Sequence, residues 1–129
     1  MLSKQELDAA LAAERAMYRA LSEVQDITRE LLDAVDRQDQ VSVRLFLSMR
    51  QEQINLRDQK ELLKKQCGGL PKEEGDLLRQ ILSGKKPAGV EGEALSLQVE
   101  RNRALLERTL QADKALSRRL AGRESFYQS

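Results

Sequence analysis

The first 67 residues contain neither glycine nor proline, and this absence constrains the fold more than any other feature of the chain. Glycine and proline are the residues that most often end a helix, so the stretch predicts very long helical structure. Ser3 followed by Glu6 fits a capping box, in which each side chain bonds the other residue's backbone N–H at a helix start. We therefore expect a helix over residues 3–66, spanning about 95 Å at roughly 1.5 Å per residue.

Apolar residues recur along this stretch in a seven-residue frame, which places them on one helical face for packing along a partner helix. The first positions of successive repeats are Leu7, Glu14, Leu21, Thr28, Val35, Ser42, Met49, Leu56 and Leu63. The stripe thins between Asp36 and Gln40, and the β-branched residues Val41 and Val43 follow. A kink or short break near residues 36–43 is therefore the alternative to a continuous helix.

Glycines and prolines divide the remainder of the chain. Gly68 and Gly69 favour the end of the first helix, and Pro71 fits the first turn of the next one. Gly84 and Gly122 are the expected stops of the two later helices. The expected elements are a short helix at about 71–82, a linker at 84–92, a last helix at about 91–121 and a tail at 122–129.

These lengths predict an all-α fold: an elongated antiparallel helical bundle in a single domain over residues 1–129. It would have one very long N-terminal helix, a short middle helix and a long C-terminal helix. Residues 1–40 hold nine acidic and five basic side chains, whereas residues 95–129 hold seven basic and four acidic ones. We therefore expect the basic last helix to lie antiparallel on the acidic half of the first, with the charges helping to choose the register.

The composition argues against several function classes. The chain has no His and a single Cys, so it lacks a His/Cys metal site and a Ser-His-Asp or Cys-His catalytic pair. Its 22 basic and 21 acidic residues give a net charge of +1, unlike the basic excess of a general nucleic-acid binder. We expect a protein that is not an enzyme, with no catalytic residues, no metal, no cofactor, no small-molecule substrate and no nucleic-acid partner.

The chain shows no signal for export or membrane insertion. The N-terminus has no apolar core of a signal peptide, and no stretch approaches about 18 uncharged apolar residues. The lone Cys67 gives no support for an oxidising compartment, and its position near a helix C-terminus favours a structural or incidental residue over a reactive thiol. We therefore expect a cytoplasmic protein with no membrane span.

The last helix and the tail carry the candidate partner-binding residues, which share a large apolar side chain. They are Leu106, Leu110, Leu116, Leu120, Phe126 and Tyr127. Leu110 and Phe126 are not obviously needed by the bundle stripe, and apolar surface of this kind often marks a site where a partner helix binds. The alternatives are that the tail folds back to close the bundle or that a second subunit covers it.

Three polar residues, Asn102, Thr109 and Asp113, lie in the apolar seam of the last helix. Buried polar residues in a seam fix the register of helix packing at some cost in stability. The alternative interpretations are simple exposure at the edge of the seam and a contact face for a partner helix.

Four segments of the chain together carry a family resemblance. The first is the long opening helix ELLDAVDRQDQVSVRLFLSMRQEQINLRDQKELL with its polar patch at Asp36–Gln40, and the second is the Gly/Pro turn that follows it. The third is LQVERNRALLERTLQADKALSRRL with Asn102 ahead of paired leucines, and the fourth is Ser125-Phe126-Tyr127. In these segments the chain resembles the FlgN family of flagellar export chaperones. It departs from that family at a second Asn, which Leu105 or Leu106 replaces here.

The resemblance implies a cytoplasmic chaperone that binds the C-terminal helical segments of hook–filament junction proteins. Such a chaperone would keep these export substrates unpolymerised and deliver them to the export gate. A partner helix would bury its apolar stripe against the last helix and the tail, and so lose its tendency to self-associate. The alternative function is a homo-oligomeric structural or regulatory coiled-coil protein.

Overall fold

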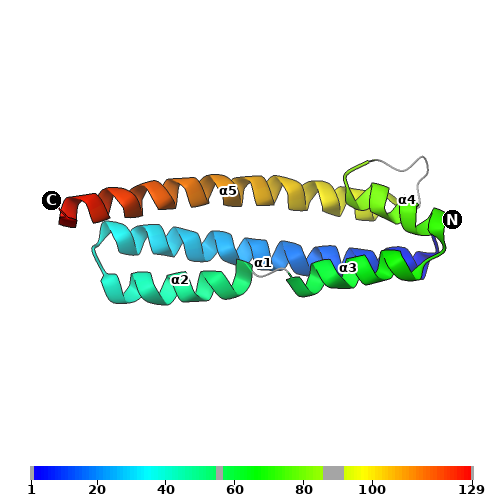
Figure 1. The fold of residues 1–129 in the computed structure, drawn as a ribbon, viewed down its shortest axis with the longest axis horizontal. Coiled ribbons are helices and arrows are strands. Elements are labelled where there is room, and N and C mark those ends of the chain that lie inside the picture. Colours follow the sequence, from blue (N-terminus) through cyan, green and yellow to red (C-terminus); the bar gives the residue numbers. More distant parts are fainter. Residues whose placement is uncertain (1, 55–56, 86–91, 129) are drawn as a thin grey trace. The chain divides into compact units, whose positions relative to one another are not determined.

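The structure is a computed structural model that describes residues 2–54, 57–85 and 92–128. The described residues form five α-helices and no strand, so the predicted all-α bundle with long first and last helices is confirmed (Figure 1). The helices are α1 (Lys4–Asp36), α2 (Gln40–Ile54), α3 (Arg57–Gly69), α4 (Lys72–Leu82) and α5 (Glu93–Gln128).

The start of α1 is the capping box predicted from the sequence. The backbone N–H of Ser3 donates to Oε2 of Glu6 at 2.9 Å, and the backbone N–H of Glu6 donates to Oγ of Ser3 at 3.1 Å. Each side chain thus satisfies a backbone donor that the first helical turn leaves without a partner.

The predicted continuous helix over residues 3–66 is wrong, because the chain turns back after α1. The backbone N–H of Gln38 donates to the carbonyl of Val35 at 3.1 Å, and that of Asp39 donates to the carbonyl of Ala34 at 3.0 Å. This pair of bonds is the Schellman motif that closes many helices. It requires a left-handed residue, and Gln38 supplies one with a φ of 60°.

Asp39 ends the turn and starts α2. Its carboxylate accepts a bond from the backbone N–H of Ser42 at 3.2 Å and one from the Ser42 hydroxyl at 2.6 Å. These bonds favour the ionised form and lower the pKa of Asp39. The break therefore lies in the segment where the apolar stripe thins, which was the alternative interpretation of the sequence.

The chain divides into two compact units. Unit 1 comprises Met1–Arg19 and Leu56–Ala104, and unit 2 comprises Ala20–Asn55 and Leu105–Ser129. Both α1 and α5 contribute residues to each unit, whereas α3 and α4 belong to unit 1 and α2 belongs to unit 2.

The core of unit 1 joins apolar side chains from all four of its helical segments. Its buried members are Leu2, Leu7, Ala10, Leu11, Ala13, Met17, Leu63, Cys67, Leu78, Ile81, Leu95 and Val99. Gly75 of α4 is part of this packing, because a Cβ there would lie 2.6 Å from the carbonyl oxygen of Cys67. Only glycine allows the two backbones to approach this closely.

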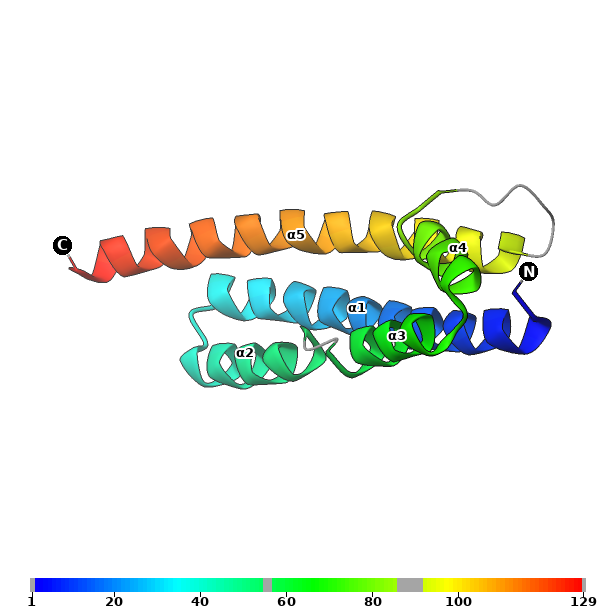
Figure 2. The same ribbon diagram turned by 45° about the vertical axis from the view of Figure 1, so that its right-hand side comes forward.

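Unit 2 is built from α2 and the second halves of α1 and α5. Leu31, Val35 and Leu116 are buried at its centre, and Leu32, Val43, Phe46 and Leu120 pack against them. Gln25 of α1 bonds Thr109 of α5, and Asp36, further along α1, bonds Arg119, further along α5. The two helices therefore run in the same direction in this unit, as both views show (Figures 1 and 2). The predicted antiparallel placement of the last helix on the first is therefore corrected. The reversal at Gln38 makes α2 the antiparallel neighbour of α1.

The glycine stops predicted for the two later helices differ in outcome. Gly84 closes α4 as expected: its φ is 97°, and its N–H and that of Lys85 donate to the carbonyls of Ile81 and Gln80 at 3.0 Å. Gly122 lacks this left-handed backbone, and α5 continues to Gln128, so the predicted tail at 122–129 is wrong for residues 122–128. No proline follows Gly122 to stop the helix.

Two further expectations concern the linker and the membrane. Residues 86–91 of the predicted linker lie outside the described residues. No helix in the described part of the chain combines the length and the apolar character that crossing a membrane requires.

Candidate protein-binding surface

The outer face of α2 carries a row of exposed apolar side chains. Val41 is 80% exposed, Leu45 is 56% exposed and Met49 is 40% exposed. Residues four apart lie above one another on the same side of a helix. We call these three residues the α2 stripe.

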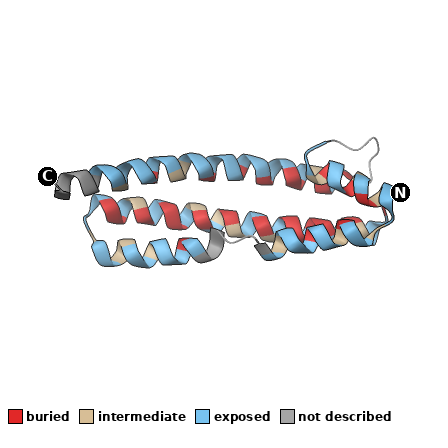
Figure 3. Cartoon of the chain, viewed as in Figure 1, coloured by how far each residue is buried: buried red, intermediate tan, exposed pale blue. Residues whose placement is uncertain are grey.

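The inner face of α2 is apolar as well. Val43 and Phe46 pack against the core of unit 2. Arg50 is the one buried residue among those of α2 whose side chains are described. Most of α2 is exposed or intermediate (Figure 3). The inner face is covered by α1 and α5, whereas the α2 stripe is exposed, as are Arg44, Leu47 and Ser48 of the same helix.

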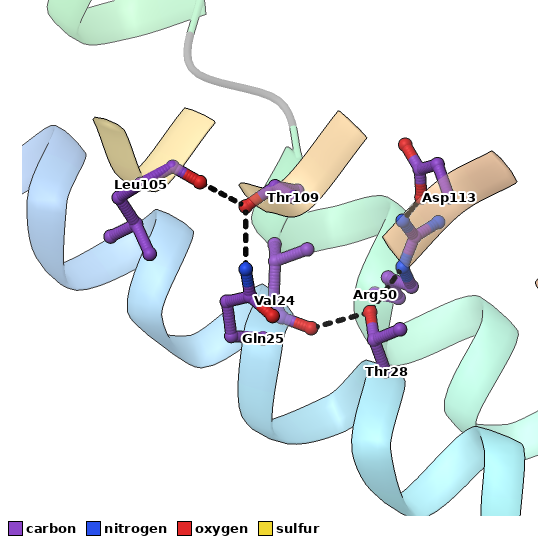
Figure 4. A network of polar contacts seen from close by, with 7 residues as sticks. All are labelled: Val24, Gln25, Thr28, Arg50, Leu105, Thr109 and Asp113. Carbon is purple, nitrogen blue, oxygen red and sulfur yellow. Dashed lines mark hydrogen bonds and ion pairs between the residues drawn. The ribbon is translucent and has the colours of Figure 1, made fainter. Parts of the chain in front are cut away.

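Arg50 fixes α2 to both neighbouring helices (Figure 4). Its Nε donates to Oγ1 of Thr28 on α1 at 2.8 Å, and its guanidinium forms an ion pair with the carboxylate of Asp113 on α5. The Thr28 hydroxyl in turn donates to the backbone carbonyl of Val24 at 2.7 Å. Burial lowers the pKa of the Arg50 guanidinium, which nevertheless remains charged at physiological pH. The network therefore sets which side of α2 faces inward.

Thr109 continues the polar seam of unit 2 (Figure 4). Nε2 of Gln25 donates to Oγ1 of Thr109 at 3.4 Å, and the Thr109 hydroxyl donates to the carbonyl of Leu105 at 2.9 Å. Thr109 and Asp113 thus each have polar partners within the chain. Both therefore help to set the register between α5 and the other helices of the unit.

The third polar seam residue, Asn102, helps to set the register between α5 and α1 in unit 1. Its Nδ2 donates to the backbone carbonyl of Glu14 at 2.8 Å and also contacts the Glu14 carboxylate, while Nε2 of Gln98 donates to Oδ1 of Asn102 at 3.0 Å. Burial raises the pKa of Glu14, although the bond from Asn102 and the charge of Arg103 act in the opposite direction. Glu14 is therefore a buried acid held by an amide.

The structure does not bring the six sequence-predicted residues onto one exposed face. Leu106 and Leu110 are exposed on α5, at 43% and 52%. Leu116 is 4% exposed in the core of unit 2, and Leu120 packs against that core. The side chains of Phe126 and Tyr127 lie outside the described residues.

Sequence reasoning missed the α2 stripe for an identifiable reason. Leu45 and Met49 fit the seven-residue frame of a helix continuing from α1, which assigns them to the buried seam. The turn at Gln38 changes the direction of the chain. Val43 and Arg50 therefore join Phe46 on the inward face, while Leu45 and Met49 are exposed. The available signal was that α2 has apolar residues on two faces.

No chemistry-bearing cluster stands out elsewhere in the described chain. Its residues include no group of three or more His, Cys, Asp or Glu side chains that could hold a metal ion. Cys67 is buried in unit 1, and this burial raises the pKa of its thiol. Comparison with known proteins finds no matching family model, no matching curated protein and no matching solved structure.

Proposed function

We propose that this chain is a non-catalytic protein-binding module whose α2 stripe receives an amphipathic helix of another protein. The observation that carries the proposal is the exposure of Val41, Leu45 and Met49 on a helix whose other face is already packed. The stripe spans about 12 Å, or roughly two helical turns. This spacing suits a partner helix that inserts apolar residues at every third or fourth position.

Charge restricts the kind of helix that would bind. Between Gln40 and Gln51 the charged residues are Arg44, which is exposed, and Arg50, which is turned inward. A partner helix with acidic residues beside its apolar stripe would therefore match α2 better than one with basic residues there.

The more specific form of the proposal is a cytoplasmic chaperone for flagellar export. It rests on the sequence resemblance to the FlgN family and is compatible with an all-α fold. In this form the partner is the C-terminal helical segment of a hook–filament junction protein. Covering the apolar face of that segment would keep it from assembling before export.

The test replaces two apolar side chains of the α2 stripe by polar ones that preserve the helix. The variant is Leu45→Gln with Met49→Gln, because glutamine forms helices well and removes the apolar surface. Light-scattering chromatography and calorimetry of the purified chain with junction-protein segments should show a one-to-one complex. The double substitution should weaken that complex at least about tenfold, since each buried apolar side chain contributes roughly 1.5–3 kcal/mol.

The matched control is Leu62→Gln on α3, because Leu62 is 61% exposed but lies in unit 1. It should bind every segment as the natural chain does. A stable self-dimer that ignores all segments and dissociates in the stripe variant would favour the homo-oligomeric coiled-coil protein instead. Binding lost in Leu106→Gln with Leu110→Gln, but retained in the stripe variant, would move the site to α5.

A further inference from the structure

The turn between α1 and α2 closes a helix with a residue poorly suited to the task. The same pair of Schellman bonds closes α1 at Gln38 and α4 at Gly84. Both central residues are left-handed, with φ of 60° for Gln38 and 97° for Gly84. This backbone is strained for a residue with a Cβ and unstrained for glycine. The α1–α2 turn therefore stores strain that the α4 turn does not.

The sequence of this turn also fits a helix. No glycine or proline occurs from Met1 to Cys67. The seven-residue frame that places Leu31 and Val35 in the core of unit 2 continues to Leu45 and Met49, which the closed chain leaves exposed. The frame is uninterrupted only if residues 37–39 are helical.

The side-chain bonds that join α1 to other helices in the described chain are made with residues that follow the turn. In unit 1, the carbonyl of Glu6 accepts a bond from Gln66 at 2.6 Å, and Glu14 is bonded to Asn102. The contacts in unit 2 join Gln25 to Thr109, Thr28 to Arg50 and Asp36 to Arg119. Because each joins α1 to a later element, the α1 of a second copy can make every one of them.

We propose that two copies of this chain exchange α1. The turn at residues 37–39 becomes helical, α1 and α2 join into one helix over residues 4–54, and each α1 packs into the other copy. The contacts of α1 are kept, and the strain at both turns is relieved, in return for the entropy of association. The occupant of the α1 site is then a second copy of the chain, and this inference does not depend on which partner binds the α2 stripe.

Two variants of the turn should shift the exchange in opposite directions. Arg37→Ala, Gln38→Ala and Asp39→Ala together remove the α2 cap and favour a helix, so this variant should refold as a dimer at high concentration. Gln38→Gly relieves the strain in the closed chain. Relief of strain at one turn should favour the closed chain about fivefold. Because the dimer opens the turn in both chains, Gln38→Gly should lower the association constant of the dimer roughly 25-fold. Light-scattering chromatography over a range of protein concentrations, after refolding from denaturant, measures both effects.

A crosslink distinguishes an exchanged dimer from two closed chains side by side. Asp36 and Arg119 are exposed and their side chains lie 3.1 Å apart, so cysteines at these positions suit a short bis-maleimide. Cys67→Ala removes the natural thiol. The crosslink should join two chains in the dimer and stay within one chain in the monomer.

Three results would overturn the exchange: an alanine variant that is helical but monomeric, a dimer whose crosslinks stay within each chain, or a Gln38→Gly variant that dimerises as strongly as the natural chain. If the alanine variant fails to fold, two other measurements test the exchange. They are the comparison of Gln38→Gly with the natural chain and the crosslink in a chain whose turn is unchanged. The stripe variant Leu45→Gln with Met49→Gln retains the turn, so its result bears on the partner and not on the exchange.

Discussion

At the scale of single residues, the charge state of Glu14 should affect the stability of the fold. Burial raises its pKa above the ordinary value of 4.5, so the folded chain prefers the protonated carboxyl. The stabilisation from protonation is complete below pH 4.5 and is lost as the pH rises through the folded-state pKa. An ionised Glu14 therefore lowers the stability of the chain near neutral pH.

We predict that Glu14→Gln raises the melting temperature at pH 7 and that this gain disappears towards pH 4.5. The side-chain oxygen of the new amide can still accept a bond from Nδ2 of Asn102, as the Glu14 carboxylate does, and the amide carries no charge to bury. Thermal melts followed by circular dichroism across this pH range measure the difference. Glu23→Gln on the exposed side of the same helix is the control and should show no such trend. An equal gain at both pH values would show that the charge of Glu14 is not the cause.

Leu116 and Leu110 should respond very differently to the same substitution. Leu116→Asp places a charge in the core of unit 2, which should reduce the free energy of unfolding by about 4 kcal/mol or more. Leu110→Asp changes an exposed position and should cost less than about 1 kcal/mol. Urea unfolding measures both values. A Leu116→Asp variant as stable as the natural chain would contradict the burial of Leu116 and support its predicted place on an accessible binding face.

At the scale of elements, the position of α2 depends on a charged pair inside unit 2. The Arg50 side chain is 11% exposed and that of Asp113 is 35% exposed, so the pair is only partly shielded from water. Asp113→Ala leaves the arginine charge buried and should cost about 2 kcal/mol. Adding Arg50→Met removes that charge and should recover at least about 1 kcal/mol of the loss. A urea double-mutant cycle measures the coupling, and strictly additive losses would mean that the pair does not hold α2.

The helix ends show what sequence patterns can and cannot reveal. Ser3 with Glu6, Pro71 and Gly84 were predictable because each residue type has one strong local reason to sit at a helix end. Gln38 was not, because a left-handed glutamine has no compositional signature and only its backbone bonds identify it. That one residue decides the length of α1.

The sequence did not predict the α2 stripe as an exposed surface, because the turn at Gln38 was not predictable either. The helical period correctly identifies which residues of a continuous helix share a face, and it groups Leu45 and Met49 with Val35. Once the chain reverses, the inward face is chosen by packing and by the bonds of Arg50, neither of which the period contains. The sequence prediction placed Leu106, Leu110 and Leu116 on one binding face, but Leu116 is buried in a cluster with Leu31 and Val35 of α1.

At the scale of the whole molecule, two cores share their helices. The boundary between the units falls between Arg19 and Ala20 within α1, and between Ala104 and Leu105 within α5. A helix is cooperative, because interrupting it in the middle creates new ends with unsatisfied backbone groups. Loss of one core should therefore undermine the helices that build the other.

We predict that the chain unfolds in a single transition, which its one cysteine can report. Cys67 is buried in unit 1, so its reactivity with a thiol reagent follows the opening of that unit, whereas circular dichroism follows all helices. Leu31→Ala in unit 2 and Leu78→Ala in unit 1 each remove a fully buried side chain and should cost about 2–5 kcal/mol. Because the helices are shared, Leu31→Ala should lower the urea midpoint of Cys67 exposure as Leu78→Ala does, in step with the loss of helix signal. A Leu31→Ala variant in which Cys67 becomes reactive at the same urea concentration as in the natural chain would instead show that the two cores unfold independently.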